Sequence, residues 1–201
     1  MYAPSNLTMS RPFSKLKGVL SRIESSTNLS SLGGCDLVVE AAFETLKVKR
    51  DIFTKLNTIV TKRDALLLSN TSTLDVDAIA SSLSPERRSY CAGMHFFSPA
   101  HIMKLVEIVR SSDTSPDTLD TIRAVTKRIK KVPVVVGNCD GFVGNRMLHP
   151  YTTEAALLLV DYGGGNAGLS IPDVDAAVGS KGFGMAVGPF VMSDIAGNDI
   201  G

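Results

Sequence analysis

Short apolar runs alternate with amphipathic segments between residues 36 and 136 of this chain. Five runs have the length of a strand, and the segments between them repeat apolar residues at helical spacing. This alternation predicts a doubly wound α/β sheet. Pro133 lies in the last run and predicts an edge or first-residue position, because proline cannot donate to a sheet ladder. The predicted strands cover residues 36–42, 65–69, 90–97, 104–109 and 132–136.

The segments between the runs carry helix signals. Residues 46–60 have apolar side chains at helical spacing. Asp75 can cap a helix that begins at Val76, and Ser115 precedes a proline and an acid, which predicts a helix start there. We expect this last helix to run to Lys131.

After residue 138 the pattern changes to helices alone. Residues 143–162 predict a long helix that is interrupted at Pro150, and a further helix spans 171–178. We therefore place a domain boundary near residues 139–141. The resulting predicted domains are a sheet domain over 1–138 and a helical domain over 139–201.

Composition narrows the class of protein. The chain has 201 residues, of which 44% are hydrophobic, and this supports a packed core. Its formal net charge of +1, without a Lys/Arg cluster, gives no indication of a nucleic-acid partner. No apolar run approaches the roughly 20 residues of a membrane span, and three scattered cysteines form no metal or disulfide pattern. We expect a soluble, intracellular protein with no targeting signal, because the internal Ser14-Lys15-Leu16 would be read only at a C-terminus.

Two ionisable residues stand in runs that are predicted to be buried. Glu107 interrupts the apolar run 104–109, and His95 lies near the end of the preceding run. An unpaired buried carboxylate is very costly, so the imidazole is its natural partner. A histidine held in this way could serve as a general base near neutral pH. The alternatives are a glutamate on an exposed edge strand and a histidine satisfied in the core.

Other polar candidates follow the predicted strands, where doubly wound sheets bind their ligands. Asn70 and Ser72 are also ordinary turn and cap residues, and the glycines at 141 and 144 could merely permit close packing. Convergence of the candidates at one edge favours a binding site. They are Glu40 and Glu44 after the first strand, Asn70 and Ser72 after the second, His95 at the end of the third, and Asn145 at the start of the helical region.

A literal GxGxxG sequence occupies residues 163–168. A dinucleotide-binding loop must follow a strand and open a helix, so that backbone N–H groups meet the pyrophosphate. This sequence follows a predicted helix, and we therefore interpret it as a surface loop. The chain has no other GxGxxG, and no strand-ending aspartate upstream that could hold a ribose.

Four motifs in order resemble the 3-hydroxyacyl-CoA dehydrogenase family, over roughly residues 20–201. The sequence Ser98-Pro99-Ala100-His101 and the segment 188–201 look most like the dehydrogenase part of peroxisomal multifunctional β-oxidation enzymes. This resemblance suggests a peroxisomal location. Ser98 stands where many relatives have asparagine. The motifs are Ser69-Asn70-Thr71-Ser72, His95-Phe96-Phe97-Ser98-Pro99, Met103-Lys104-Leu105-Val106-Glu107 and Gly141-Phe142-Val143-Gly144-Asn145-Arg146.

The resemblance implies oxidation of an L-3-hydroxyacyl-CoA to the 3-ketoacyl-CoA, with hydride transfer to NAD, in fatty acid β-oxidation. His95 would then be the base, and Glu107 would orient it and stabilise its charged form. Ser72 and Asn145 would bind the reacting oxygen. The positions implied around the cofactor are Glu44, Lys49, Asn70, Ser72 and Ser98.

The sequence also departs from the family pattern, because the strand, GxGxxG loop, helix and acid-ending strand that open family chains are absent from it. We therefore expect an incomplete Rossmann-type sheet followed by the start of an all-helical domain, with the absent first strand central, between the retained halves. In relatives the helical domain supplies the rest of the substrate lobe and the subunit contacts. A fragment of this kind is expected to bind NAD weakly and to be inactive alone.

Two rival functions stay open. Some relatives act on small free hydroxy acids, although Phe96-Phe97 and Met103-Lys104-Leu105 favour an acyl-CoA substrate. The second rival is a non-catalytic remnant that binds acyl-CoA or a partner subunit.

Overall fold

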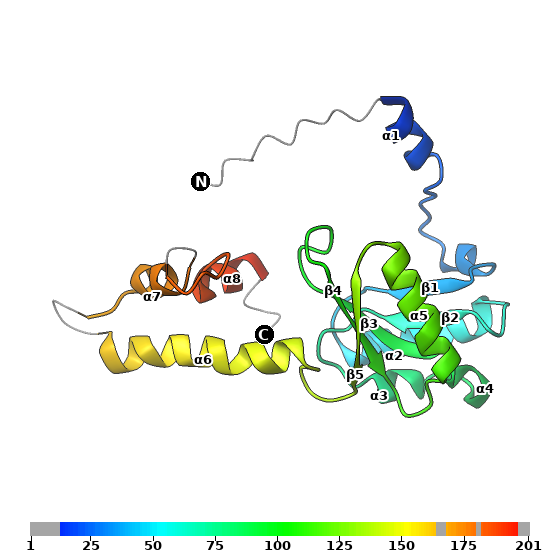
Figure 1. Ribbon diagram of the computed structural model, residues 1–201. Coiled ribbons are helices and arrows are strands. Elements are labelled where there is room, and N and C mark those ends of the chain that lie inside the picture. Colours follow the sequence, from blue (N-terminus) through cyan, green and yellow to red (C-terminus); the bar gives the residue numbers. More distant parts are fainter. Residues whose placement is uncertain (1–12, 164–167, 180–181, 197–201) are drawn as a thin grey trace.

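The computed structural model describes residues 13–163, 168–179 and 182–196. Five strands form one sheet in the order β1-β2-β3-β4-β5 (Figure 1). All five predicted strands are present, and Pro133 lies in the edge strand β5, as predicted. The strands are β1 (Leu37–Glu40), β2 (Leu66–Ser69), β3 (Cys91–Phe96), β4 (Leu105–Arg110) and β5 (Val132–Gly137).

Strand direction determines which residues meet at one edge of the sheet. The strands β1, β2 and β3 are mutually parallel, β4 is antiparallel to β3, and β5 is parallel to β4. The carboxyl ends of the first three strands therefore lie at the same edge as the amino end of β4. This edge carries the polar candidates from the sequence.

Helices cover both faces of the sheet. Alternate residues of β2 point to opposite faces: Leu67 packs with α2 (Leu46–Ile59) and α3 (Val76–Ala80), whereas Leu68 packs with α5 (Pro116–Arg128). The doubly wound α/β architecture is therefore confirmed. It is mostly parallel, with β3 and β4 as its one antiparallel pair.

The predicted helix starts are confirmed by their caps. Asp75 accepts hydrogen bonds from the N–H groups of residues 77 and 78, and Ser115 accepts one from Thr118. The helix α5 ends at Arg128 rather than at the predicted Lys131. Lys130 has a φ of 62°, in the left-handed region, which a continuing right-handed helix does not allow.

The chain after β5 is helical, as predicted, and extends away from the sheet in Figure 1. The predicted interruption at Pro150 is wrong, because α6 (Gly144–Tyr162) continues through it. The ring of a proline fits helical φ, and Pro150 lies on the exposed side of α6, where the carbonyl it leaves without an N–H can bind water. Two further helices, α7 (Ile171–Val178) and α8 (Pro189–Ala196), pack beside α6. No helix among the described residues is both long and apolar enough to cross a bilayer.

Several short elements were not predicted, and the glycine sequence is only partly described. Its residues 164–167 lie outside the described part of the chain, while its first glycine caps the end of α6. That glycine therefore follows a helix, as expected. The additional elements are α1 (Phe13–Leu20), the 3-10 helix η1 (Leu29–Leu32), α4 (Pro85–Arg88) and α8.

The expected gap in the middle of the sheet is also wrong. Each strand hydrogen-bonds to the next one in the order, so no position is free between two retained halves. Antiparallel neighbours need only a short connection, and residues 97–104 join β3 directly to β4. Within the described residues β1 pairs with β2 alone, so it is an edge strand.

Candidate active site

His95 and Glu107 form a buried pair at the edge where the first three strands end. Nδ1 of His95 lies 2.9 Å from Oε2 of Glu107, and the two residues are 4% and 1% exposed. The strand β4 lies between β3 and β5, so the alternative of a glutamate on an exposed edge strand is wrong. No hydrogen bond to Nε2 of His95 is present among the described residues, and this nitrogen is the one available to exchange a proton.

The second oxygen of Glu107 contacts the start of the helical region. Oε1 accepts hydrogen bonds from the backbone N–H groups of Val143, at 3.0 Å, and Gly144, at 2.8 Å. These amides belong to the first turn of α6, whose partial positive charge favours a carboxylate. Glu107 therefore joins the histidine on β3 to the first turn of α6.

Aromatic rings surround His95. The ring centroids of Phe97 and Phe142 lie 4.5 Å and 5.9 Å from that of the imidazole. A Cβ atom on Gly144 would lie 2.5 Å from Phe97, so the glycine permits this close approach. Gly141 has a φ of 67°, which glycine adopts at little cost. Gly144 therefore permits close packing, whereas Gly141 provides a backbone conformation that favours glycine.

The loop that follows β2 also contacts α6. The side-chain amide of Asn145 donates to the backbone carbonyl of Ser72 at 3.3 Å. Oδ1 of Asn70 accepts the N–H of Phe96 at 2.9 Å, which connects the ends of β2 and β3. Ser72 and Asn145 are therefore brought together, and Asn70 supports the strand end beside His95.

A buried ammonium group lies at the end of β1. Lys49 is 1% exposed, and its Nζ lies 3.0 Å from Oε1 of Glu40 and 3.0 Å from Oε2 of Glu44. Its third neighbour is the carbonyl of Ala42, at 3.4 Å. The three donors of the ammonium are therefore engaged within the chain, and Lys49 presents no charge to solvent.

Glu44 connects this cluster to the loop after β2. Its Oε1 accepts hydrogen bonds from the hydroxyl of Thr71 and from the N–H of Ser72, the latter at 2.7 Å. Burial alone would raise the pKa of Glu44, but the hydrogen bonds from Thr71, Ser72 and Lys49, with the charge of Lys49, outweigh it and lower the pKa. Glu44 is therefore ionised at neutral pH.

Ser98 lies apart from this network. It is exposed, it precedes Pro99 through a cis peptide bond, and its side chain makes no hydrogen bond to the described residues. Glu40, by contrast, is predicted only to follow a strand, yet it is buried and paired. The signal that could have identified it is the one that identified Glu107, a carboxylate in an apolar strand.

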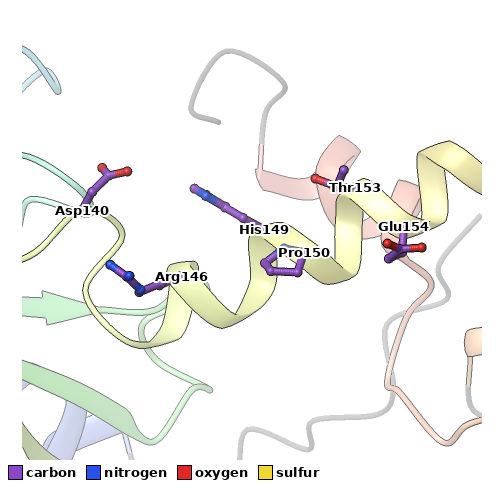
Figure 2. A pocket seen from close by; sticks show the side chains of 6 residues that line it. All are labelled: Asp140, Arg146, His149, Pro150, Thr153 and Glu154. Atoms are coloured by element: carbon purple, nitrogen blue, oxygen red, sulfur yellow. The ribbon is translucent and has the colours of Figure 1, made fainter.

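A shallow pocket of about 670 Å³ lies beside the first turns of α6. Figure 2 shows that Arg146 and His149 project from this helix on the side of Asp140. The pocket has two acidic and two potentially basic side chains, so it has no single charge preference. Its lining residues are Asp140, Arg146, His149, Pro150, Thr153 and Glu154.

Comparison with known proteins identifies the family. Residues 6–139 match the NAD binding domain of 3-hydroxyacyl-CoA dehydrogenase, and residues 141–201 match the C-terminal domain of the same enzymes. The chain belongs to the 3-hydroxyacyl-CoA dehydrogenase family. The family domain over residues 6–139 is an NAD-binding one, so NAD is the cofactor of this fold, as the resemblance predicted.

Peroxisomal proteins are among the similar sequences. The chain is 47% identical to the peroxisomal bifunctional enzyme of Homo sapiens over 176 residues, which covers 88% of this chain and 23% of that protein. It is 40% identical to a peroxisomal fatty acid beta-oxidation multifunctional protein of Arabidopsis thaliana over 191 residues, which covers 95% of this chain and 24% of that protein. The chain therefore spans about a quarter of the length of these relatives.

Solved structures show the same fold. The 3-hydroxybutyryl-CoA dehydrogenase of Escherichia coli matches with a TM-score of 0.81 at 34% identity, over 93% of this chain and 38% of that one. The (S)-3-hydroxybutyryl-CoA dehydrogenase of Ralstonia eutropha matches with a TM-score of 0.82 at 32% identity, over 94% of this chain and 64% of that one. The family assignment and the fold therefore agree.

Proposed function

We propose that this chain carries the proton-transfer site of an NAD-dependent oxidation of L-3-hydroxyacyl-CoA to 3-ketoacyl-CoA, in fatty acid β-oxidation. The observation that carries the proposal is the buried pair of His95 and Glu107, in which Nδ1 is held at 2.9 Å from the carboxylate. With Nδ1 engaged, Nε2 receives the proton of the substrate hydroxyl. Glu107 orients the ring and stabilises the imidazolium that forms.

Ser72 and Asn145 are proposed to bind the reacting oxygen. They lie on the loop after β2 and on the first turn of α6, and the contact of 3.3 Å between them brings these two segments together. A hydroxyl and an amide can both donate to an oxygen that changes from alcohol to carbonyl. Such donors hold the carbinol carbon in one orientation, which is a large part of the work of an active site.

The donors at this edge fit the nicotinamide end of NAD. The Nδ2 atom of Asn70 and the hydroxyl of Ser72 have no hydrogen-bond partner among the described residues, and both can serve carboxamide or ribose oxygens. The half-buried Glu44 follows β1 and the exposed Ser98 follows β3, and Lys49 acts through Glu44. When bound, NAD supplies the hydride acceptor.

The relatives support further parts of the proposal. Peroxisomal bifunctional and multifunctional proteins resemble this chain along most of its length, and we infer an acyl-CoA substrate and a peroxisomal setting for it. We also infer a division of labour near residues 138 and 139, with NAD on the sheet domain and the helical domain completing the substrate lobe and the subunit contacts.

Enzyme assays test this function. The 201-residue polypeptide and a longer protein that contains it are incubated with NADH and acetoacetyl-CoA, and NADH absorbance is followed, with His95→Gln as the control. Consumption of NADH that depends on His95 supports the dehydrogenase. Absence of turnover in both proteins, together with acyl-CoA binding in a calorimetric titration, would instead favour the alternative of a non-catalytic binding protein.

A further inference from the structure

Glu40 is the most thoroughly engaged side chain at the end of β1. Its side chain is 2% exposed. Oε1 accepts the N–H of Ala42 at 2.6 Å, and Oε2 accepts the hydroxyl of Ser69 at 2.7 Å. Its backbone carbonyl accepts the N–H of Asn70 at 2.7 Å. Glu40 thus contacts the end of β2 through both its main chain and its side chain.

The same carboxylate holds the buried Lys49. Nζ lies 3.0 Å and 3.1 Å from the two oxygens of Glu40. A buried ammonium is costly unless it is paired and hydrogen-bonded. Two carboxylates share this ammonium. Glu40 also binds Ala42 and Ser69, whereas Glu44 also accepts the N–H of Ser72 at 2.7 Å.

We propose that Glu40 is a positioning residue, which holds Lys49 so that Glu44 keeps the loop at Ser72 in place. Glu40 contacts Lys49 and the backbone of Asn70, and we assign it no contact of its own with substrate or cofactor. It acts through two other side chains, and the loop it supports carries Thr71 and Ser72. The inference rests on the proposed function only where activity is measured.

Removal of one charge shows how the positioning works. In Glu40→Gln the ammonium of Lys49 keeps a single carboxylate, that of Glu44. We expect Glu44 to turn both oxygens toward Lys49 and to release the N–H of Ser72, because a buried ammonium that has lost one carboxylate costs more than one hydrogen bond from an amide. Ser72 then loses its fixed position at the edge of the sheet.

Amide hydrogen exchange measures this directly and needs no activity. In Glu40→Gln, the amide of Ser72 should exchange faster than in the wild-type chain. The amide of Leu67, which donates to Tyr90 at 3.0 Å within the sheet, should be unchanged and reports global unfolding. Glu24→Gln is the matched control, since it removes the same charge from an exposed position.

Kinetics in an active protein that contains the chain provides the second readout. Glu40→Gln should lower kcat by about tenfold to a hundredfold, the usual effect of a misplaced group, while KM for the acyl-CoA changes little. Wild-type kcat together with wild-type exchange at Ser72 would overturn the proposal. If wild-type protein shows no dehydrogenase activity, the proposed function fails, and the exchange result at Ser72 still decides the role of Glu40.

A double variant separates positioning from stability. Glu40→Gln with Lys49→Met removes both buried charges, and it should be more stable to urea than Glu40→Gln alone. Lys49→Met also removes the contact that holds Glu44, so exchange at Ser72 should stay fast and kcat should stay low. If the double variant recovered its stability and also showed wild-type exchange at Ser72 and wild-type kcat, Glu40 would be merely structural. If Glu40→Gln does not fold, exchange at Ser72 and kcat in the double variant distinguish the positioning role from a structural one by the same criteria.

Discussion

His95 and Glu107 are directly opposite residues in the antiparallel pair of β3 and β4. Side chains at such positions lie on the same face of the sheet, within reach of each other. One carboxylate oxygen lies 2.9 Å from the imidazole, and the other accepts two amides at the start of α6. The glutamate therefore connects the proposed base to the helical region as well as orienting it.

His95→Gln should lower turnover by about two to four orders of magnitude, the usual contribution of general acid–base catalysis. Glutamine can still accept from the substrate hydroxyl but cannot take its proton, so KM should change much less than kcat. Steady-state kinetics in an active protein that contains the chain provide the measurement. His101→Gln, at an exposed position, is the control. Near-normal turnover in His95→Gln would remove this residue from the role of base.

Glu107→Gln should lower turnover and loosen the start of α6. A neutral amide still accepts hydrogen bonds but stabilises neither the imidazolium nor the helix terminus as a carboxylate does. The amides of Val143 and Gly144 should accordingly exchange faster. In His95→Gln those two amides should stay protected. Turnover and an exchange pattern like those of the wild type would limit Glu107 to a packing role.

The sequence predicted this pair because a lone carboxylate in an apolar run requires a partner. Glu40 carries the same signal, because it is a carboxylate at the end of an apolar strand and is buried there. Lys49 is also marked in the sequence, since it precedes Phe53 by four residues and Leu56 by seven and so shares their buried face. A cation at such a position predicts a buried ion pair.

The sequence predicts which segments are strands better than it predicts the order of the strands in the sheet. Local periodicity identifies strands but does not say which strands are neighbours, and so the expected central gap was wrong. Pro150 illustrates a second limit, because a proline on an exposed helix position lacks one hydrogen bond without breaking the helix. The contact between Ser72 and Asn145 joins residues 73 positions apart, and only the folded chain brings them together.

Stability should fall in acid through Glu44 and Asp77. Burial alone would raise the pKa of each carboxyl, but other interactions outweigh burial and lower it. At Glu44 these are the hydrogen bonds from Thr71, Ser72 and Lys49 and the charge of Lys49. At Asp77 they are the hydrogen bonds from Ser112 and Asn138. A carboxyl with a lowered folded pKa stabilises the native state fully above its unfolded pKa, about 4. That contribution is lost as the pH falls through the folded pKa.

Urea unfolding between pH 7 and pH 2.5 measures this loss. The free energy of unfolding of the wild-type chain should decline below about pH 4, and Glu44→Gln should show a shallower decline, because it has one fewer group to protonate. Glu24→Gln, whose carboxylate is exposed, should retain the wild-type slope. Equal slopes in all three proteins would show that Glu44 is not bound more tightly in its ionised form when folded.

The three cysteines should differ strongly in their reactivity toward a disulfide reagent. Burial raises the pKa of the Cys91 thiol to about 12, and the negative charge of Asp77 adds to this. Because the thiolate is the reactive form, Cys91 should be inert in the native chain. Cys139 is exposed and should react first.

The fast phase of the labelling reaction should disappear in Cys139→Ser, and Cys91 should become reactive only in denaturant. Labelling of Cys91 in the native chain at the rate of Cys139, located by mass spectrometry, would mean that the sheet opens locally at β3.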